Sequence, residues 1–341
     1  MRLAVVGAGA IGGTIGAYLV RAGHDVTFVD VDSDHVAAIR ASGLRIEGPI
    51  DTFTVQAEAY APSEVPGRFD TVLLCVKAQA TRAAAEDLAR FLSVDGCVVS
   101  LQNGLNELVI EAIVGRERTV GCFVNFGADY IEPGVIHFGG RGALVLGELD
   151  GSVTPRLETL TNVLRDFDPG AFSTDNIWGY LWSKLAVGTM IFATALTDEG
   201  IADCYDEERY RPLFTSIARE VLAIAIANGV VPEPFDGFEP AGFLPGAPEE
   251  RAVRSLDAMV AFNRRSAKTH SGVWRDLAVR HRKTEAEAQL GPIIERAHAL
   301  GRAAPLTVAI AQQIAQVEGG GRTRSSANLD ELLSATADGI A

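Results

Sequence analysis

The hydrophobic pattern divides the chain into two parts with different periods. In the first part, short runs of apolar residues alternate with stretches in which apolar residues recur at helical spacing. Uninterrupted apolar runs of this length are typical of parallel strands that are buried on both faces. The predicted strands cover residues 1–6, 25–30, 71–76, 96–101 and 119–124. Strands that alternate with helices predict a doubly wound α/β domain.

Shorter elements complete this first domain. We predict helices over 13–21 and 33–41, a hairpin over 44–48 and 51–58, and a Gly-rich antiparallel pair over 135–138 and 143–146. The antiparallel pair closes the domain near residue 170. The expected first domain therefore spans residues 1–172.

From about Ile177 the apolar residues recur every three or four positions, which predicts helices throughout. The expected helices cover 178–195, 207–228, 252–265, 284–300 and 306–317, with a Pro/Gly-rich link over 231–246. We therefore predict an all-helical second domain at 173–320. The remaining segment, 321–341, has a weak helical pattern and is expected to be peripheral.

Composition agrees with this two-domain organisation. A chain of 341 residues is long for one core. Its 48% hydrophobic and 22% charged residues are ordinary for a globular protein. The formal net charge of −14 argues against a nucleic-acid or anionic-membrane partner, because those partners favour a basic surface. A small anionic ligand stays compatible with this charge.

The expected cellular setting is the cytoplasm. The first strand begins at Met1, which leaves no room for a targeting segment. No uncharged apolar run approaches the roughly 18 residues of a membrane-spanning helix. The cysteines, Cys75, Cys97, Cys122 and Cys204, stand apart without metal-site spacing. Isolated cysteines in apolar company are expected to be reduced core residues.

A glycine-rich turn joins the first strand to the first helix, with the sequence Gly7-Ala8-Gly9-Ala10-Ile11-Gly12. This GxGxxG pattern between a strand and a helix is the fingerprint of dinucleotide binding. Gly7 permits the tight turn, Gly9 the approach of a pyrophosphate, and Gly12 close packing of helix on strand. The helix N-terminus favours the anion. The alternative is a glycine turn with a purely structural role.

The residue at the end of the second strand bears on the choice of cofactor. Asp30 ends that strand, eighteen residues after Gly12. An acidic residue here accepts hydrogen bonds from the adenosine ribose and repels the 2′-phosphate of NADP. No Arg or Lys lies between Asp30 and Arg40. The sequence therefore favours NAD over NADP, unless Asp30 is only a turn residue.

Further segments occur in a characteristic order, namely Val76-Lys77-Ala78, Leu101-Gln102-Asn103-Gly104, Trp182-Ser183-Lys184-Leu185, Trp274-Arg275-Asp276-Leu277 and Thr284-Glu285. Together with the glycine turn, they make the chain resemble the ketopantoate reductase (2-dehydropantoate 2-reductase) family over roughly residues 1 to 318, as a divergent member. The resemblance implies a Rossmann domain followed by an all-α domain like that of 6-phosphogluconate dehydrogenase. It also implies reduction of a 2-oxo acid with a nicotinamide cofactor.

The resemblance implies three catalytic residues. Lys184 matches the lysine that protonates the carbonyl oxygen as hydride reaches the carbon, chemistry suited to an ammonium group. Asn103 matches the asparagine between the nicotinamide and that lysine, although it is also an ordinary turn residue before a glycine. Glu285 matches the glutamate that orients the substrate. Glu287 is a competitor for this role, and either carboxylate is also typical of an exposed helix start.

Two more positions follow from the resemblance. Ser271 corresponds to the serine that contacts the substrate carboxylate, with Gly272 as the alternative because the spacing is one residue longer than usual. Lys77 corresponds to a cofactor-contacting lysine, although a surface lysine is also common at such a place.

Two positions depart from the family. Its substrate helix usually carries asparagines four and eight residues after the lysine, where this chain has Gly188 and Phe192. A lost hydrogen-bond partner for a buried polar group costs about 1–3 kcal/mol. We therefore expect Gly188 and Phe192 to line a site for a 2-oxo or 2-hydroxy acid with a bulkier, less polar side chain than ketopantoate.

The expected function is an NAD(P)-dependent oxidoreductase that interconverts a 2-oxo acid and a 2-hydroxy acid by hydride transfer at C2. One alternative is ketopantoate reductase proper, which uses NADPH for pantothenate synthesis. A second is a non-catalytic dinucleotide sensor, which has no need of a proton donor. No metal site is expected, because the six histidines are scattered. A homodimer is a further open expectation.

Overall fold

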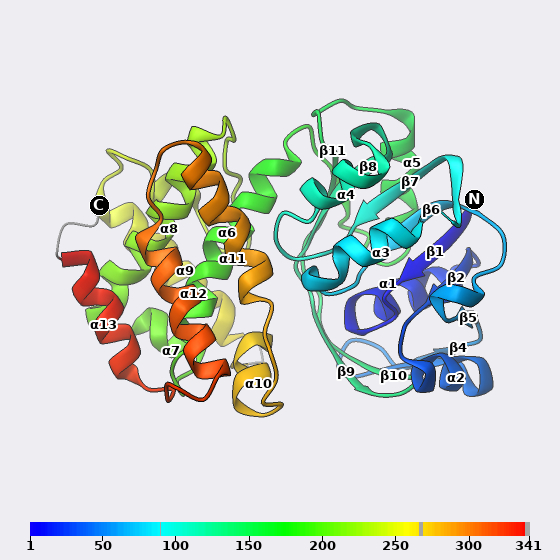
Figure 1. The fold of residues 1–341 in the computed structure, drawn as a ribbon, viewed down its shortest axis with the longest axis horizontal. Helices are drawn as coiled ribbons and strands as arrows, with labels where there is room; N and C mark the ends of the chain where they lie inside the picture. The colour runs from blue at the N-terminus through cyan, green and yellow to red at the C-terminus, as the bar shows by residue number, and fades with distance from the viewer. Residues whose placement is uncertain (89, 266–268, 338–341) are drawn as a thin grey trace. The chain divides into compact units, whose positions relative to one another are not determined.

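The computed structural model describes residues 1–88, 90–265 and 269–337 (Figure 1). The chain forms two compact units, Met1–Ile177 and Trp178–Ala341, which we call unit 1 and unit 2. The sequence predicts this boundary at residue 172, five residues earlier. Each unit is described separately below.

Unit 1 is built around an eight-stranded sheet in the order β12-β11-β8-β7-β6-β1-β2-β5. Its strands are β1 (Arg2–Val6), β2 (Asp25–Val29), β5 (Glu58–Tyr60), β6 (Phe69–Leu74), β7 (Leu92–Ser100), β8 (Thr119–Val124), β11 (Leu144–Glu148) and β12 (Phe172–Ser173). All neighbours from β5 to β8 are parallel, and β11 pairs antiparallel with β8. The predicted doubly wound α/β domain is confirmed.

The strand order reverses beside β1. The chain runs from β1 to β2 and β5 on one side, then returns to β6, β7 and β8 on the other. In open α/β sheets, ligands bind outside the carboxyl ends of the strands at such a switch point. The fold thus points to the carboxyl end of β1 as the place for a ligand.

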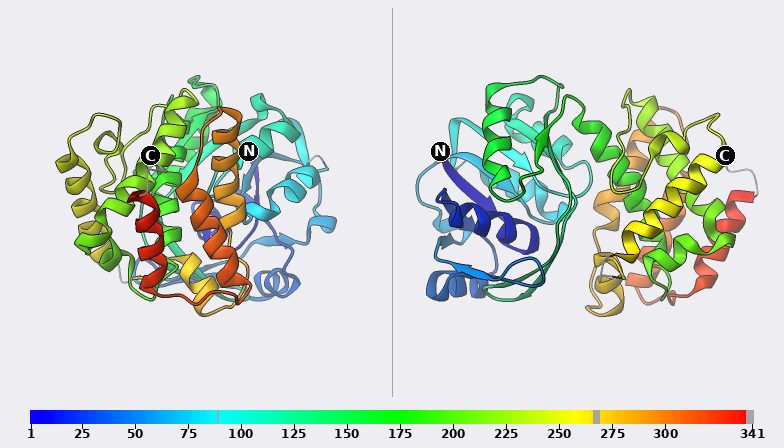
Figure 2. Two further views of the ribbon diagram at one scale, coloured as in Figure 1. Left: turned by 60° about the vertical axis from the view of Figure 1, so that its left-hand side comes forward. Right: turned by 180° about the vertical axis from the view of Figure 1, so that it is seen from behind.

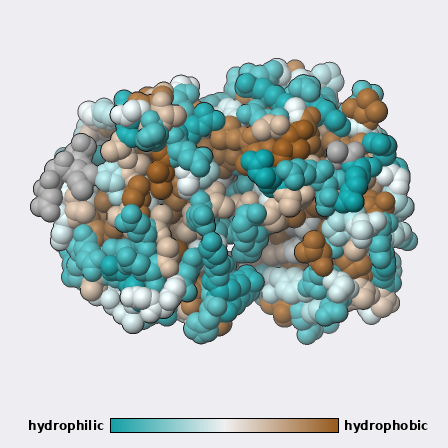
Figure 3. All heavy atoms as spheres, in the orientation of Figure 1, coloured by the Kyte–Doolittle hydropathy of each residue, from teal (hydrophilic) through white to brown (hydrophobic). Residues whose placement is uncertain are grey.

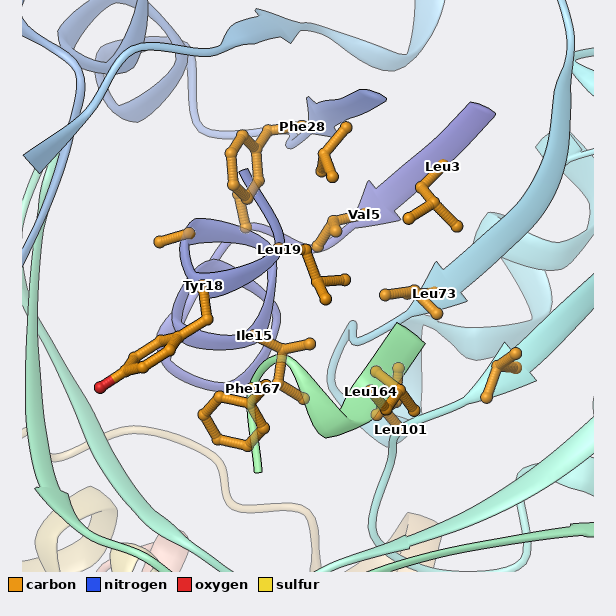
Figure 4. Close-up of a cluster of buried hydrophobic side chains, with 14 of the residues drawn as sticks. Leu3, Val5, Ile15, Tyr18, Leu19, Phe28, Leu73, Leu101, Leu164 and Phe167 are labelled. Carbon is orange, nitrogen blue, oxygen red and sulfur yellow. The ribbon is translucent and has the colours of Figure 1, made fainter. Parts of the chain in front are cut away.

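Both faces of the sheet are covered. Its helices are α1 (Ala10–Arg21), α2 (Ser33–Ser42), α3 (Thr81–Leu88), α4 (Glu107–Val114) and α5 (Pro155–Arg165). Successive residues of β1 point to opposite faces. Leu3 joins a buried cluster with residues of α1 and α5 (Figure 4), whereas Ala4 joins a second cluster with residues of α3 and α4. Burial on both faces explains the uninterrupted apolar runs.

A second, four-stranded sheet lies in unit 1 with the order β4-β3-β10-β9. Its strands are β3 (Leu44–Glu47), β4 (Phe53–Val55), β9 (Gly127–Glu132) and β10 (Val135–Gly140). The predicted hairpin is present as the antiparallel pair β3–β4. The end of its second predicted strand instead becomes β5, which pairs with β2 in the large sheet.

The predicted pairing of 135–138 with 143–146 is wrong. β10 pairs with β9 and β3, while β11 pairs with β8 and β12, in different sheets. The residues of β11 are buried on both faces, which demands a place in the large sheet. The true partner β9 has no strong apolar pattern. Its signal was the turn at Pro133-Gly134, where Gly134 has φ +79°.

Unit 2 is all-helical, as predicted, and Figure 2 shows it from two further sides in green to red. Its helices are α6 (Ile177–Thr194), α7 (Ile201–Asp206), α8 (Arg211–Ala227), α9 (Glu249–Arg264), α10 (Gly272–Ala278), α11 (Ala286–Ala299), α12 (Pro305–Glu318) and α13 (Ser326–Ala337). The two shortest, α7 and α10, were not predicted, because six or seven residues are too few to show a helical period.

The tail expected to be peripheral is instead part of unit 2. Helix α13 packs against α8 and α12. Leu329 and Leu332 are buried, and the Asn328 side-chain amide donates to the Leu196 carbonyl at 2.8 Å. Two buried leucines at helical spacing outweigh the polar composition of the segment. The tail therefore contributes to the core of unit 2.

Within the described ranges, no helix is long and apolar enough to cross a membrane. The four cysteines are free thiols, three of them buried. The face drawn in Figure 3 carries predominantly hydrophilic residues, with hydrophobic ones gathered in patches.

Candidate active site

The glycine turn after β1 needs glycine at two of its positions. Gly7 has φ +92°, and a Cβ there lies 2.8 Å from the backbone of Cys75 and Val76. A Cβ on Gly12 lies 2.1 Å from the Gly7 carbonyl oxygen. Side chains at either position collide with backbone, so the turn and its contact with β6 require both glycines.

Gly9 differs from these two. A Cβ on Gly9 meets nothing within 4 Å, although the residue is the N-cap of α1. The first amide groups of α1 have no intrahelical carbonyl partners and lie at the positive end of the helix dipole. Open space beside these donors fits a dinucleotide pyrophosphate, which is the chemistry predicted for this turn.

The Asp30 carboxylate is hydrogen-bonded to the glycine turn. Its Oδ2 accepts a hydrogen bond from the Ala8 amide at 2.7 Å, and its Oδ1 accepts one from the Asp32 amide at 3.0 Å. A carboxylate has about four acceptor sites, so capacity remains for the hydroxyls of a ribose. Arg40, the first arginine after Asp30 along the chain, is bonded to the Ala59 carbonyl and Glu64. The Arg40 guanidinium is therefore engaged by groups other than Asp30.

Four predicted cofactor segments share one edge of the sheet. Gly7, Asp30, Lys77 and Asn103 follow the carboxyl ends of β1, β2, β6 and β7, which are parallel neighbours. Lys77 is exposed at the start of a short 3-10 helix, Ala78–Ala80. The structure thus brings these segments to the edge where the fold places a ligand.

A buried hydrogen-bond network fixes the loop that carries Asn103. The Gln102 amide donates to the Val76 carbonyl and to Thr81 Oγ1, both at 2.7 Å. Thr81 donates in turn to the Asn106 side chain, which donates to the Asn103 carbonyl. The Asn103 side chain itself is exposed. Gln102 therefore ties this loop to the Lys77 segment, a role that the sequence did not reveal.

In unit 2, Lys184 lies in the middle of the buried helix α6. Its neighbours Trp182, Ser183 and Leu185 are buried, while Lys184 is half-buried. Gly188, one turn later on the same face, is also half-buried, and a Cβ there meets nothing within 4 Å. The helix therefore presents an ammonium group beside an open space.

The structure gives Phe192 no access to a ligand, because its side chain is 2% exposed. Thr189 and Thr194 do not replace the missing asparagines either. Thr189 donates to the Leu185 carbonyl and Thr194 to the Ile191 carbonyl, so both hydroxyls bond within their own helix. The open position on α6 is therefore at Gly188.

Glu285 and Glu287 have different surroundings. Glu287 is exposed and pairs with Lys283 at 2.8 Å, and this ammonium lowers the pKa of the Glu287 carboxyl. Glu285 is half-buried at the N-cap of α11. Just before it, Thr284 donates its amide and its hydroxyl to Glu318 Oε1, at 2.8 and 2.6 Å. Glu318 thus fixes the backbone from which Glu285 projects.

Ser271 is buried at the N-cap of α10, where its hydroxyl accepts from the Trp274 amide at 3.0 Å. The hydroxyl proton remains able to donate to a carboxylate. Further on, the buried Asp276 carboxylate accepts from Arg280 and Arg282. Asp276 therefore supplies a buried counter-charge for Arg280 and Arg282.

Comparison with protein families shows which family the two units belong to. The model described as ketopantoate reductase PanE/ApbA matches residues 3–151, and its C-terminal counterpart matches residues 176–318. The chain belongs to the ketopantoate reductase family. The predicted resemblance is confirmed, and so is the prediction of an enzyme of the ketopantoate reductase type.

The family relatives are distant. The 2-dehydropantoate 2-reductase of Halobacterium salinarum is 30% identical over 332 residues, covering 94% of this chain and all of the relative. That of Pyrococcus abyssi is 27% identical over 311 residues, covering 90% and 95%. Such identities fit the expectation of a divergent family member. They indicate 2-dehydropantoate 2-reductase or a related 2-hydroxyacid dehydrogenase activity.

Solved structures agree with the fold of this ketopantoate reductase family member. A PanE/ApbA family ketopantoate reductase from Ralstonia eutropha JMP134 has TM-score 0.78 and 27% identity, covering 94% of this chain and 99% of that one. A D-mandelate dehydrogenase with NADH and anilino(oxo)acetate has TM-score 0.82 and 21% identity, covering 95% and 100%. The second likeness concerns the fold alone.

A neighbour in fold, D-mandelate dehydrogenase, was solved in complex with NADH. The open glycine turn of this chain fits a dinucleotide. No group of three or more metal-ligating side chains occurs in the part of the chain that the structure describes.

Proposed function

We propose that the protein interconverts a 2-oxo acid and a 2-hydroxy acid by hydride transfer at C2, with NAD as cofactor and Lys184 as general acid/base. The observation that carries this proposal is a half-buried ammonium in the centre of α6, on a chain whose other unit has a turn shaped for a dinucleotide. A lysine with no role beyond solvation does not require a half-buried position in the middle of a helix. A dinucleotide sensor has no need of the lysine.

Lys184 supplies both charge and a proton. The nicotinamide, when bound, supplies or accepts the hydride. As a carbonyl carbon gains hydride, its oxygen becomes an alkoxide, which an ammonium stabilises and then protonates. In the reverse direction, the neutral amine removes the proton from the hydroxyl group. Burial among apolar neighbours strengthens this electrostatic effect.

Other residues have supporting parts in the proposal. Asn103, on its fixed loop, orients the reacting carbonyl, and Lys77 contacts the cofactor. Glu285 orients the substrate. The Ser271 hydroxyl donates to the substrate carboxylate. Its bond with the Trp274 amide uses the oxygen as an acceptor and leaves the proton available.

The NAD preference rests on Asp30. Its carboxylate lies at the end of β2 with Asp32 and Asp34 close behind, and Arg40 is bonded elsewhere. A 2′-phosphate brought here meets the like charges of these carboxylates.

The substrate proposed for this site has a bulkier, less polar side chain than ketopantoate. The position that carries an asparagine in the family is Gly188, which offers space and no hydrogen bond. An apolar substrate group fills such a space without leaving a polar partner unsatisfied. Phe192 is not proposed to contact the substrate, because its side chain is buried and packs inside unit 2.

Initial rates with purified protein test this function. We expect NADH oxidation with 2-oxo acids that carry bulky apolar or aromatic side chains, and slower rates with ketopantoate or NADPH. Fast NADPH oxidation with ketopantoate would instead identify the biosynthetic reductase. NADH binding without turnover of any 2-oxo acid would favour the sensor. Light scattering of the same sample tests the expected homodimer.

Substitution of Gly188 tests the substrate side-chain space. We expect Gly188→Asn to fold, because a Cβ there meets nothing within 4 Å. Its amide should raise kcat/KM for ketopantoate and lower it for bulky apolar 2-oxo acids, each by about ten-fold, which corresponds to one hydrogen bond or a few buried methylene groups. The control Gly188→Ala adds no polar group and should stabilise the helix by about 1 kcal/mol. Equal effects of both variants on ketopantoate would contradict the proposal.

Removal of Glu318 tests the position of Glu285. Glu318→Ala leaves the amide and hydroxyl of the buried Thr284 without their shared acceptor, which costs about 1–3 kcal/mol in the free energy of unfolding. We expect a rise in KM for the 2-oxo acid with an unchanged Kd for NADH, measured by steady-state kinetics and fluorescence titration. Glu318→Gln retains an acceptor oxygen and should restore most of both properties.

A further inference from the structure

We propose that His35 is a positioning residue for the dinucleotide. One hydrogen bond from its ring to the Ala8 carbonyl orients the central peptide group of the glycine turn, and the β9–β10 hairpin holds the ring in the tautomer that makes this bond. The inference rests on the proposed NAD binding and adds to it a residue from α2 and a role for the second sheet. Neither follows from the glycine pattern.

His35 is fully buried between three segments of unit 1. Its Nε2 lies 2.9 Å from the Ala8 carbonyl oxygen, and its Nδ1 lies 2.9 Å from the amide nitrogen of Gly134, in the turn of the β9–β10 hairpin. The ring packs edge-on against Tyr130 of β9, with centroids 5.1 Å apart. One side chain therefore joins α2, the glycine turn and the hairpin.

The hairpin decides which ring nitrogen carries the proton. The Gly134 amide is a donor, so Nδ1 must be the acceptor in that bond. A neutral imidazole then carries its proton on Nε2, which makes His35 the donor to the Ala8 carbonyl. Without the Gly134 amide, the ring is free to adopt the other tautomer and lose this donor.

Tyr130 also reaches the start of α2. Its hydroxyl donates to Asp32 Oδ2 at 3.2 Å, while Asp32 Oδ1 caps the helix by accepting from the amides of Asp34 and His35. Burial, together with the nearby Asp32 carboxylate, raises the pKa of Tyr130 to about 12, so the hydroxyl remains a donor. These contacts fix the backbone from which the His35 side chain projects.

Ala8 is held on both sides by side chains. Asp30 accepts from its amide at 2.7 Å, and His35 donates to its carbonyl. A trans peptide group is planar, with its carbonyl and the next amide pointing in opposite directions. The bond to the Ala8 carbonyl therefore aims the Gly9 amide away from His35. An amide fixed in advance binds a pyrophosphate at a lower entropic cost than a mobile one.

Two substitutions of His35 separate its two hydrogen bonds. The amide nitrogen of glutamine is as many bonds from Cβ as Nε2, so His35→Gln can keep the donor to Ala8 but loses the acceptor for Gly134. The oxygen of asparagine corresponds to Nδ1, so His35→Asn can keep the acceptor but loses the donor. Each variant forfeits one buried bond, so both should show a lower melting temperature. The matched control is His24→Asn, at a partly exposed histidine whose Nε2 lies 2.7 Å from Asp166 Oδ2.

We expect His35→Asn to raise the Kd for NADH about ten-fold, whereas His35→Gln and His24→Asn remain within two-fold of the unsubstituted protein. Hydrogen exchange without cofactor should show faster exchange of residues 7–13 in His35→Asn alone. Equal NADH affinities of the Asn and Gln variants would overturn the inference. Absence of NADH binding in the unsubstituted protein would instead overturn the proposed function.

Discussion

Lys184→Ala should abolish turnover while NADH binding persists. The variant removes the ammonium group that we propose protonates the developing alkoxide, and general acid catalysis alone contributes roughly 10²–10⁴-fold. We expect kcat to fall by about 10³-fold or more, measured with the best 2-oxo acid from the rate screen. The Kd for NADH, measured by fluorescence titration, should change less than three-fold because the dinucleotide turn belongs to unit 1.

Two further variants sharpen this test. Lys184→Arg keeps the positive charge but not a readily released proton, so it should recover little of the lost kcat. Lys283→Ala removes an exposed lysine that pairs with Glu287, and its kcat should remain near that of the unsubstituted protein. A Lys184→Ala variant with more than a tenth of the original kcat would contradict the assigned role of Lys184.

The fold was predictable where burial dictates the sequence pattern. Inner strands of the large sheet such as β1, β6 and β8 are covered on both faces, so their apolar runs are uninterrupted and easily recognised. The β9 strand is half-exposed along most of its length and has no such run. It was therefore missed, and β10 was assigned a wrong partner. The local signal that remained was the Pro133-Gly134 turn.

The site was predictable to the extent that its chemistry lies in local motifs. The glycine turn and Asp30 belong to one strand-helix-strand unit, so their proximity follows from the sequence. The contacts of His35 and Gln102 span long distances along the chain, up to the 99 residues between His35 and Gly134. No period or spacing encodes such a contact. The local motifs therefore supply the groups that we propose for the chemistry, whereas the long-range contacts of His35 and Gln102 leave no signal in the sequence.

Alanine substitutions of two glycines in the glycine turn should affect different properties. Gly12→Ala should lower the stability of the free protein, whereas Gly9→Ala should weaken NADH binding. In Gly12→Ala, the new Cβ lies 2.1 Å from the Gly7 carbonyl oxygen, with Cys75 and Val5 at 2.8 Å. Neither the backbone nor the packed strand can yield cheaply, and such overpacking costs typically 1–3 kcal/mol or more. We expect a clear fall in the urea midpoint of unfolding before any cofactor is added.

Gly9→Ala should leave the free protein almost unchanged, because its Cβ meets nothing within 4 Å and its φ of −69° suits alanine. If the open space receives the pyrophosphate, however, the methyl group occupies it. The Kd for NADH should then rise on the order of 100-fold, equivalent to about 2.7 kcal/mol. Unfolding in urea and NADH titration of both variants check the contrast. A purely structural turn does not need glycine at position 9, so the test depends on the ligand alone. A Gly9→Ala variant that binds NADH normally would show that the pyrophosphate does not occupy this space.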